Sequence, residues 1–200
     1  LLQQTDDNLA KGFRAIKMKV GRANIAEDVE RVKRMREHLG DGFPLMVDAN
    51  MRWRVDEAVR AARAFAPYDL TWLEEPIIPE DYQGHAQVAR EGGIPIASGE
   101  NLRSLWKYKQ LISCDCATSL MTAARLAEAL NLPVTSHGAH DITVHLLAAC
   151  PNRSYLEAHG FGLENYVTEP FVIQDGHAIA GMKPVHGVNF DWHKLEHLKG

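Results

Sequence analysis

The chain has 200 residues, of which 46% are hydrophobic and 24% charged, a composition typical of a globular domain with one buried core. A net charge of −4 and a pI near 6.2 argue against a nucleic-acid-binding surface, and no apolar run reaches the length of about 18 residues that suggests a membrane span. The polar, acidic start (LLQQTDDN) is unlike a signal peptide, and three cysteines without paired spacing predict neither disulfides nor a zinc site, so we expect a cytoplasmic protein.

The first predicted strand carries two lysines on one face. Residues 1–11 are typical of the end of a helix, and the stretch Phe13–Val20 (FRAIKMKV) follows them. Because side chains alternate along a strand, Lys17 and Lys19 share one face and the neighbouring apolar residues share the other. We expect the apolar face to pack against helices and the lysines to face inward, although two lysines can also simply be exposed to solvent.

Three further apolar runs each end in a carboxylate. The carboxylates are Asp48 in PLMVDAN, Glu74 in LTWLEEP and Glu100 at the end of IPIASGE. Asp48 and Glu74 are 26 residues apart, and so are Glu74 and Glu100. Helices are predicted between these strands, over residues 24–39, 55–65 and 83–90. A repeated strand and helix indicates βα units of a parallel sheet, in which the carboxyl ends of the strands meet at one edge.

Carboxylates gathered at one edge of a sheet repel one another unless a cation neutralises them. Oxygen ligands suit Mg²⁺, with Mn²⁺ as the alternative, whereas zinc prefers histidine or cysteine. Asn50 shares a face with Asp48, which has a structural alternative as the cap of the next helix. Glu75 lies on the face opposite Glu74, where we expect it to support a ligand or to contact the surface.

The repeat breaks after Glu100. The next candidate residue, His137, comes 37 residues later, which is longer than one repeat and shorter than two. Helices are predicted over residues 102–112 and 118–130, and they leave only SCDCA (113–117) between them, a poor strand. Either the chain departs from the repeat here, or roughly a dozen residues that carry a strand are absent.

Two more strands are predicted after the break. LPVTSHG carries His137 at its end, a helix follows over residues 141–149, and RSYLEAH offers Glu157. The tail, residues 160–200, is rich in turn-forming residues and is expected to pack back over the structure. The other histidines are expected to be surface or structural residues: His38, His85, His140, His145, His159, His177, His186, His193 and His197.

These residue types predict one kind of chemistry. A lysine and a histidine on opposite sides of a metal-held substrate can remove and return protons. The natural reaction is removal of a proton α to a carboxylate, because the metal stabilises the enediolate that develops. If a hydroxyl lies on the next carbon, acid assistance expels it as water; otherwise return of the proton from the other side inverts the centre.

Six motifs also resemble a known family. KMK, VDAN, LEEP, SGEN, SHG and YLEAH occur in this order, and together they resemble the C-terminal barrel of the mandelate racemase branch of the enolase superfamily. The resemblance implies an α/β fold, a TIM-like (β/α)-barrel, and a homo-oligomer. Residues 1–200 would then form the C-terminal catalytic barrel domain, with the tail packing toward a capping domain that this sequence does not contain.

The resemblance also implies roles for the residues in those motifs. Lys19 and His137 would be acid/base groups on opposite sides of the substrate, and Lys17 would contact the substrate carboxylate. Glu157 would donate a hydrogen bond to the enediolate, which requires it to be protonated, and Asn50 would lie close to the substrate. The Mg²⁺ ligands would be Asp48, Glu74 and Glu100.

Two features depart from the family pattern. Family members carry an aspartate on the sixth barrel strand that orients the histidine, and Asp115 stands in a different context. The first barrel strand is also not found, so we expect an incomplete barrel that lacks its first strand and its sixth.

The predicted activity is dehydration of an acid sugar, an aldonate or aldarate, to a 2-keto-3-deoxy acid. A racemase or epimerase, or a lactone cycloisomerase, is the alternative that uses the same groups. A Schiff-base lyase in which Lys19 attacks a carbonyl, and a catalytically inactive barrel scaffold, are alternatives from other classes. The expected partner is a small carboxylate substrate, with no nucleic acid and no membrane.

Overall fold

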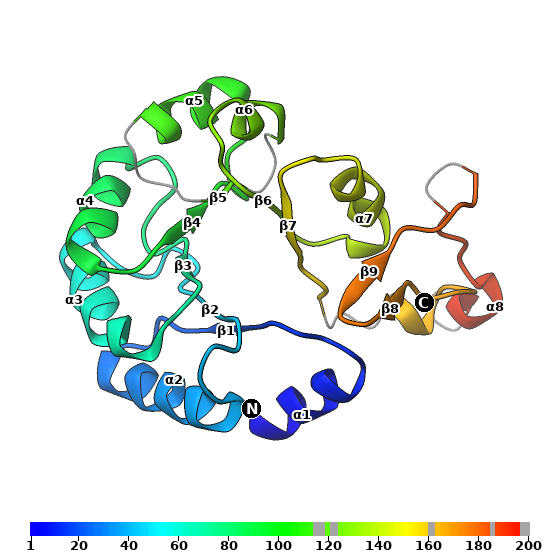
Figure 1. Ribbon diagram of the computed structural model, residues 1–200, viewed down its shortest axis with the longest axis horizontal. Helices are drawn as coiled ribbons and strands as arrows, with labels where there is room; N and C mark the ends of the chain where they lie inside the picture. The colour runs from blue at the N-terminus through cyan, green and yellow to red at the C-terminus, as the bar shows by residue number, and fades with distance from the viewer. Residues whose placement is uncertain (114–118, 121–123, 160–162, 185–186, 197–200) are drawn as a thin grey trace.

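Seven parallel strands, each paired with the next along the chain, form one curved sheet in the computed structural model (Figure 1). The structure describes residues 1–113, 119–120, 124–159, 163–184 and 187–196. The strands are β1 (Ile16–Lys19), β2 (Leu45–Asp48), β3 (Trp72–Glu74), β4 (Ile96–Ser98), β5 (Ser119–Leu120), β6 (Val134–Ser136) and β7 (Arg153–Leu156). This is the predicted α/β barrel architecture, in which helices alternate with strands and lie outside the sheet.

The helices closely follow the predicted pattern over the first half of the chain. They are α1 (Leu2–Ala10), α2 (Ile25–Leu39), α3 (Val55–Phe65), α4 (Tyr82–Gly92), α5 (Leu105–Ser113), α6 (Ala124–Ala129) and α7 (His140–Ala148), with a 3-10 turn at Ala66–Tyr68. Helix α2 begins where the side chain of Asn24 accepts a hydrogen bond from the N–H of Ala26, and it ends at Gly40. No helix in the described part of the chain is both long and apolar enough to cross a bilayer.

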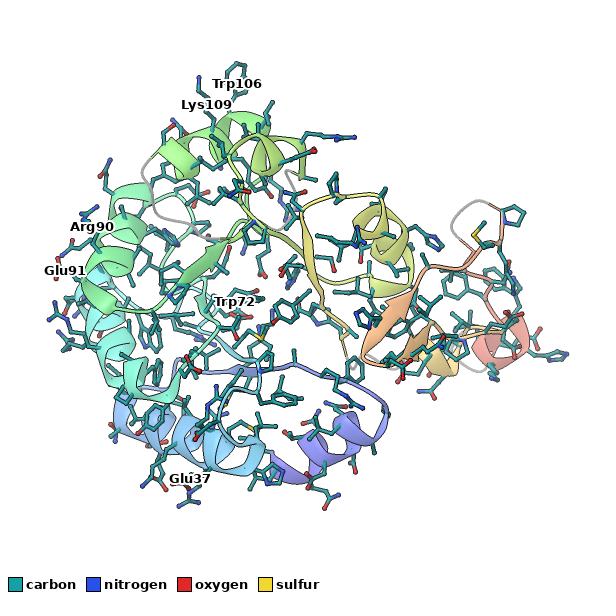
Figure 2. All side chains as sticks on the ribbon, in the orientation of Figure 1. Glu37, Trp72, Arg90, Glu91, Trp106 and Lys109 are labelled. Carbon is teal, nitrogen blue, oxygen red and sulfur yellow. The ribbon has the colours of Figure 1, made fainter. Side chains whose placement is uncertain are left out.

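The two faces of the sheet differ as the alternation predicts. The outer face is apolar: Met18, Val47 and Leu73 belong to the main core, together with Met35 of α2 and Phe65 of α3. Burial of such side chains contributes about 1.5–3 kcal/mol each, so this layer fixes the register of the strands. The inner face carries a smaller apolar cluster, Met46, Trp72 and Ala97, and Figure 2 shows Trp72 inside the ring of strands.

The strand register brings the predicted polar residues to one edge. Lys19 pairs with Asp48, and Asp48 pairs with Glu74. Glu100 follows β4 by two residues, after a turn at Gly99 whose φ of 133° suits glycine. The polar residues therefore meet at the carboxyl ends of the strands.

A short strand lies where we expected one to be absent. Ser119 pairs with Ala97 of β4, and Leu120 pairs with both Ser98 of β4 and Val134 of β6. The predicted helix over 118–130 is therefore wrong at its start, and α6 begins only at Ala124. The reason is that β4 and β6 present backbone groups that need partners, and this demand outweighs local helix preference.

The tail forms a hairpin of β8 (Val172–Gln174) and β9 (His177–Ile179), followed by the short helix α8 (Trp192–Leu195) and preceded by a 3-10 turn at Leu163–Asn165. Asp175 and Gly176 form the hairpin turn with positive φ angles, as a two-residue turn requires. Ile173 packs against Gly12 and the turn packs against Arg14. The hairpin therefore covers the segment before β1, while packing toward a capping domain stays a prediction.

Candidate active site

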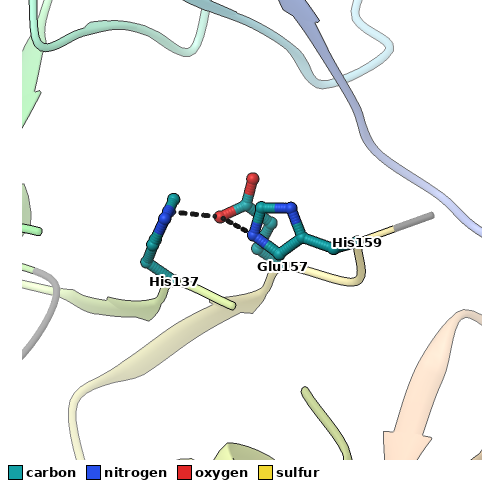
Figure 3. Close-up of side chains that lie close together, drawn as sticks. All are labelled: His137, Glu157 and His159. Atoms are coloured by element: carbon teal, nitrogen blue, oxygen red, sulfur yellow. Dashed lines mark ion pairs between the residues drawn. The ribbon is translucent and has the colours of Figure 1, made fainter. Parts of the chain in front are cut away.

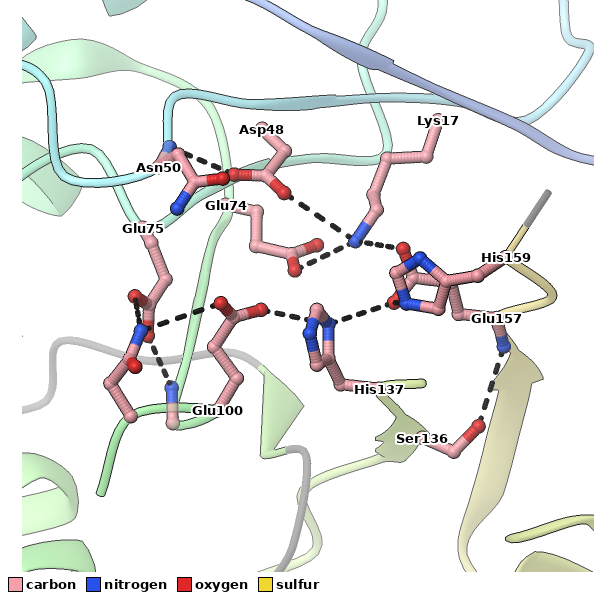
Figure 4. A network of polar contacts seen from close by, with 12 residues as sticks. Lys17, Asp48, Asn50, Glu74, Glu75, Glu100, Ser136, His137, Glu157 and His159 are labelled. Carbon is pink, nitrogen blue, oxygen red and sulfur yellow. Dashed lines mark hydrogen bonds and ion pairs between the residues drawn. The ribbon is translucent and has the colours of Figure 1, made fainter. Parts of the chain in front are cut away.

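The ammonium group of Lys17 lies among three carboxylates at the carboxyl ends of the strands (Figure 4). Its Nζ is 2.8 Å from Glu74 Oε1, 2.5 Å from Glu157 Oε1 and 3.6 Å from Asp48 Oδ2. Burial alone would lower the pKa of Lys17, but the charges of Glu74 and Glu157 outweigh burial and raise the pKa above its ordinary value. Lys17 is therefore a fixed cation at the centre of the cluster.

Glu74 is fully buried and both of its oxygens have partners. Oε1 accepts from Lys17, and Oε2 accepts a 3.0 Å hydrogen bond from the indole N–H of Trp72. Burial raises the pKa of Glu74 to about 7, and the neighbouring charge of Asp48 adds to this against the opposing effect of Lys17. One ammonium group thus does not compensate all of the negative charge collected here.

Lys19 stands at the rim of the same cluster. Its Nζ donates to Asp48 Oδ2 at 2.5 Å and to Asn50 Oδ1 at 2.8 Å. Its side chain is 59% exposed, against 15% for Lys17. The two lysines that the sequence placed on one face therefore differ: Lys17 is buried among carboxylates, and Lys19 reaches solvent where a substrate can meet it.

His137 links the cluster to β7. Its Nδ1 lies 2.8 Å from Glu100 Oε2 and 2.9 Å from Glu157 Oε2, ion-pair distances that lack hydrogen-bond angles. Contact with Glu100 first, and then with Glu157, raises the pKa of His137 to about 10. His137 is therefore an imidazolium in this arrangement.

Glu157 lies between two cationic side chains, Lys17 and His137. Burial would raise the pKa of Glu157, but His137 and Lys17 outweigh burial and lower the pKa to about 2. The side chain is therefore an ionised acceptor in this arrangement, and its role as a donor to the enediolate stays a prediction. The physical reason is that its two nearest neighbours are both cations.

His159 is a neighbour of the site that the sequence interpretation missed. Its Nε2 lies 3.5 Å from Glu157 Oε2, and its ring packs edge-on against His137 with the ring centres 5.0 Å apart (Figure 3). It was expected to be a surface or structural residue, and it lines the site instead. The available signal was its position two residues after Glu157, which returns the side chain to the same side of an extended chain.

Glu75 and Asn101 form a second layer behind the carboxylates. Glu75 is fully buried, which favours the supporting role over the surface contact. Its carboxylate accepts from Asn101 Nδ2 at 2.6 Å and from the N–H of Gly99 at 3.3 Å. Glu75 therefore holds the turn that carries Glu100.

The donor set at this edge fits a hard divalent cation. Ligand atoms of Glu74, Glu100 and His137 lie within 4.8 Å of one another. Asp48 stands outside that group but at the same strand ends, 3.6 Å from Lys17. Glu100 Oε2 is buried without a hydrogen-bond partner, and oxygen donors from three consecutive strand ends are the ligands that Mg²⁺ prefers.

A cavity of about 770 Å³ opens beside the cluster. Lys17 and Lys19 of β1 line it from one side, and Tyr155 and Glu157 line it from the other. No pairing in the described part of the chain joins β7 to β1, so the cavity lies between the two edges of the sheet. Its volume suits a small-molecule ligand.

Comparison with known proteins identifies relatives of this chain. The chain is 52% identical to the 3,6-anhydro-alpha-L-galactonate cycloisomerase of Streptomyces coelicolor over 211 residues, which is 99% of this chain and 58% of that protein. It is 36% identical to the L-talarate/galactarate dehydratase of Salmonella typhimurium, over 90% of this chain and 48% of that protein. The chain thus spans about half of the length of the relatives it matches.

Solved structures share the fold closely. A structure described as a racemase from Streptomyces coelicolor with bound magnesium matches at a TM-score of 0.93 and 50% identity, covering 98% of this chain and 58% of that one. The Salmonella typhimurium dehydratase, crystallised with Mg and L-lyxarohydroxamate, matches at a TM-score of 0.89 and 32% identity, covering 96% of this chain and 52% of that one. A family model described as enolase C-terminal domain-like matches residues 1–194. The resemblance seen in the six motifs is confirmed: this chain belongs to the enolase C-terminal domain-like family.

Proposed function

We propose that this chain carries the catalytic machinery for Mg²⁺-dependent β-elimination from a sugar acid. The observation that supports this is the placement of a solvent-reaching amine, Lys19, and an imidazolium, His137, around one buried carboxylate cluster. A base and an acid on either side of a cation-binding centre suit removal of an α-proton followed by loss of the oxygen on the next carbon.

The proton transfers follow from these two residues. As the neutral amine, Lys19 takes the proton from the carbon next to the substrate carboxylate and becomes an ammonium group. The electron pair of that C–H bond forms a double bond to the next carbon. The bond from that second carbon to its oxygen breaks. His137 donates a proton to the departing oxygen from Nε2, because Nδ1 faces Glu100 and Glu157. The resulting enol then becomes a 2-keto-3-deoxy acid.

The cation and its neighbours hold the substrate for these steps. Asp48, Glu74 and Glu100 would bind Mg²⁺, which supplies charge stabilisation for the carboxylate oxygens of the substrate when bound. Lys17 adds a fixed positive charge beside the same oxygens, and Asn50 orients Lys19 through their 2.8 Å hydrogen bond. Glu157 holds Lys17 and His137 in place and becomes a donor only after taking a proton.

Two substrates fit this chemistry, and we propose the anhydro sugar acid first. An ether bridge from carbon 3 of an anhydro sugar acid puts its oxygen on the carbon next to the α-carbon, so elimination opens the ring without loss of water. The 52% identity to an anhydrogalactonate cycloisomerase supports this reaction. The 36% identity to an aldarate dehydratase supports the second candidate, in which a free hydroxyl leaves as water. This order reverses the one predicted from sequence.

Incubation of the purified protein with Mg²⁺ and a panel of sugar acids in D₂O tests the proposal. We expect a 2-keto product with deuterium at carbon 3, and mass spectrometry distinguishes an isomer from a product that has lost water. Lys19→Ala and His137→Asn should each lower kcat by about 10²–10⁴-fold, whereas Lys33→Ala, on the outer surface of α2, should leave it unchanged. Retention of activity in Lys19→Ala, or no exchange and no keto acid with any substrate, would overturn the proposal.

A further inference from the structure

Three metal-ligating atoms converge at the ends of β6 and β7, beside the carboxylate cluster. They are Nδ1 of His137, Oε2 of Glu157 and Nε2 of His159, and all lie within 4.8 Å of one another (Figure 3). The carboxylate oxygen is 2.9 Å from the first nitrogen and 3.5 Å from the second. These are the separations of donors that share one ion at bond lengths of about 2.1 Å.

The donor chemistry of this triad differs from that of the neighbouring carboxylates. Two imidazole nitrogens and one carboxylate oxygen suit Zn²⁺, Co²⁺, Ni²⁺ or Fe²⁺, whereas Mg²⁺ prefers oxygen. The three atoms come from two adjacent strand ends, so they occupy one side of an ion and leave its other side to the cavity that Glu157 and His159 line. That open side gives an ion a route in.

Glu157 can pair with Lys17 and ligate an ion at the triad at the same time. Its Oε1 pairs with Lys17 at 2.5 Å, while Oε2 faces the two imidazoles. An ion bound to Oε2 therefore leaves the pair with Lys17 in place. It does compete with Glu100, whose Oε2 lies 2.8 Å from the same nitrogen of His137.

We propose that His137, Glu157 and His159 form a second metal site, which binds an imidazole-preferring divalent cation such as Zn²⁺ and inhibits the enzyme when occupied. The ion would take the place of the proton on Nδ1 of His137, and binding releases that proton to solvent because only the neutral imidazole ligates a metal. Inhibition rests on the proposed function, because the ion fixes the imidazole that donates a proton to the leaving oxygen. Substitution of His159 distinguishes metal binding at the triad from catalysis, since His159 contributes to the triad and has no part in the proposed proton transfers.

Titration of chelator-treated protein tests the binding. We expect one Zn²⁺ to bind in calorimetry in the presence of saturating Mg²⁺, and Co²⁺ to give a visible absorption band. His159→Gln should weaken binding of both ions at least about tenfold, and His193→Gln, whose side chain is 96% exposed, should leave it unchanged. Equal Zn²⁺ affinity in His159→Gln and the parent protein would overturn the site, whether or not any sugar acid reacts.

Activity measurements test the inhibition separately. In the presence of Mg²⁺, Zn²⁺ should inhibit the parent protein and His193→Gln at the concentrations at which it binds. Measured against its own rate with Mg²⁺ alone, His159→Gln should need at least about ten times more Zn²⁺ for the same fractional inhibition. Zn²⁺ bound at the triad of an enzyme that keeps its full rate would overturn the inhibitory role. If the parent protein shows no activity with Mg²⁺ and no Zn²⁺ present, that result counts against the proposed function and not against the metal site.

Discussion

Trp72 fixes the carboxylate of Glu74, which we propose as a Mg²⁺ ligand. Its indole N–H donates to Glu74 Oε2 over 3.0 Å, and it lies two residues before Glu74 on the same face of β3. A hydrogen bond to a charged acceptor contributes about 1.5–3 kcal/mol. The indole therefore fixes the rotamer of the carboxylate and leaves Oε1 pointing toward Lys17.

Trp72→Phe is expected to weaken Mg²⁺ binding about tenfold, because a loss of about 1.4 kcal/mol is a factor of ten. The ring volume is largely kept, so stability should fall only modestly. Calorimetric titration of chelator-treated protein with Mg²⁺ measures the change. Trp106→Phe is the matched control, because Trp106 is 73% exposed on α5 and points outward in Figure 2. Equal affinity in both variants would contradict the prediction.

The site residues that could be predicted from the sequence are those that alternate with apolar residues along a strand. Lys17 and Lys19 alternate with buried apolar neighbours, so their common face could be predicted and is confirmed. His159 follows the end of β7, where no apolar alternation marks the face, and only its spacing of two residues from Glu157 pointed to the site. The ionised state of Glu157 depends on two cations from distant strands, and no local pattern carries that information.

At the scale of elements, the loop after β1 is fixed by one buried carboxylate. Asp28, in the first turn of α2, is fully buried. Its Oδ2 accepts from the backbone N–H groups of Gly21 and Arg22, each at 2.7 Å, and Oδ1 accepts from Arg31 at 2.6 Å. This arrangement ties α2 to the loop that leaves β1, the strand that carries Lys17 and Lys19.

Asp28→Asn should lower the free energy of unfolding by about 3 kcal/mol, because an amide N–H₂ would face backbone donors that are left unpaired. Urea unfolding followed by circular dichroism measures this change. Glu27→Gln is the control: Glu27 pairs with Arg22 on the surface, and such pairs contribute about 0–1 kcal/mol. Similar effects of the two substitutions would show that the buried contacts of Asp28 do not stabilise the fold.

Arg36 plays the matching role at the opposite end of the strands. Its guanidinium donates to four backbone carbonyls in two loops, at 2.8 to 2.9 Å: those of Gly40, Phe43, Tyr68 and Asp69. These loops lead into β2 and β3. One side chain thus aligns the starts of two strands whose ends carry Asp48 and Glu74.

Arg36→Lys should destabilise the protein by about 2–4 kcal/mol, because one ammonium group cannot reach four carbonyls and leaves buried acceptors unpaired. Thermal unfolding is the measurement. Arg34→Lys, at an exposed position paired with Glu30, should shift the unfolding temperature little. If both variants unfold at the same temperature, the buried guanidinium is dispensable.

Elements with strong local signals were predictable, and the short ones were not. The helix over 55–65 has the bounds found for α3, because its apolar face repeats along the whole helix. Strand β5 has two residues, Ser119 and Leu120, too few for a pattern of any period, and it exists because its neighbours need partners. The preceding CDC motif lies outside the described residues.

At the scale of the whole molecule, the charged groups of the site gather at the carboxyl ends of the strands. The outer apolar layer and the loops held by Arg36 set the strand positions, and the strand ends then bring together groups that are far apart in sequence. Lys17 and Glu157, from opposite edges of the sheet, meet at 2.5 Å. The site therefore depends on the curvature of the complete sheet, and local signals could give its residues but not their contacts.

Burial of His85 in the folded chain makes the free energy of unfolding depend on pH. This residue of α4 is fully buried, and its Nδ1 donates to the carbonyl of Asp81 at 3.0 Å. Burial lowers the pKa of His85 below its ordinary value, although the charge of Asp81 opposes the shift. The unfolded chain takes up a proton near pH 6.5, whereas the folded chain resists it. Stability from this residue is therefore complete above about pH 6.5 and is lost as the pH falls toward the lower folded-state pKa.

Comparison of His85→Gln with the parent protein isolates this effect from the other titrating groups. Between about pH 6.5 and pH 5, the free energy of unfolding of the parent should fall by up to about 1.4 kcal/mol per pH unit more than that of the variant. Urea unfolding at several pH values gives both curves, and His193→Gln should run parallel to the parent because His193 is exposed in both states. A constant difference between parent and His85→Gln over this range would mean that His85 accepts its proton equally well when folded, and that burial in α4 does not exclude the charge.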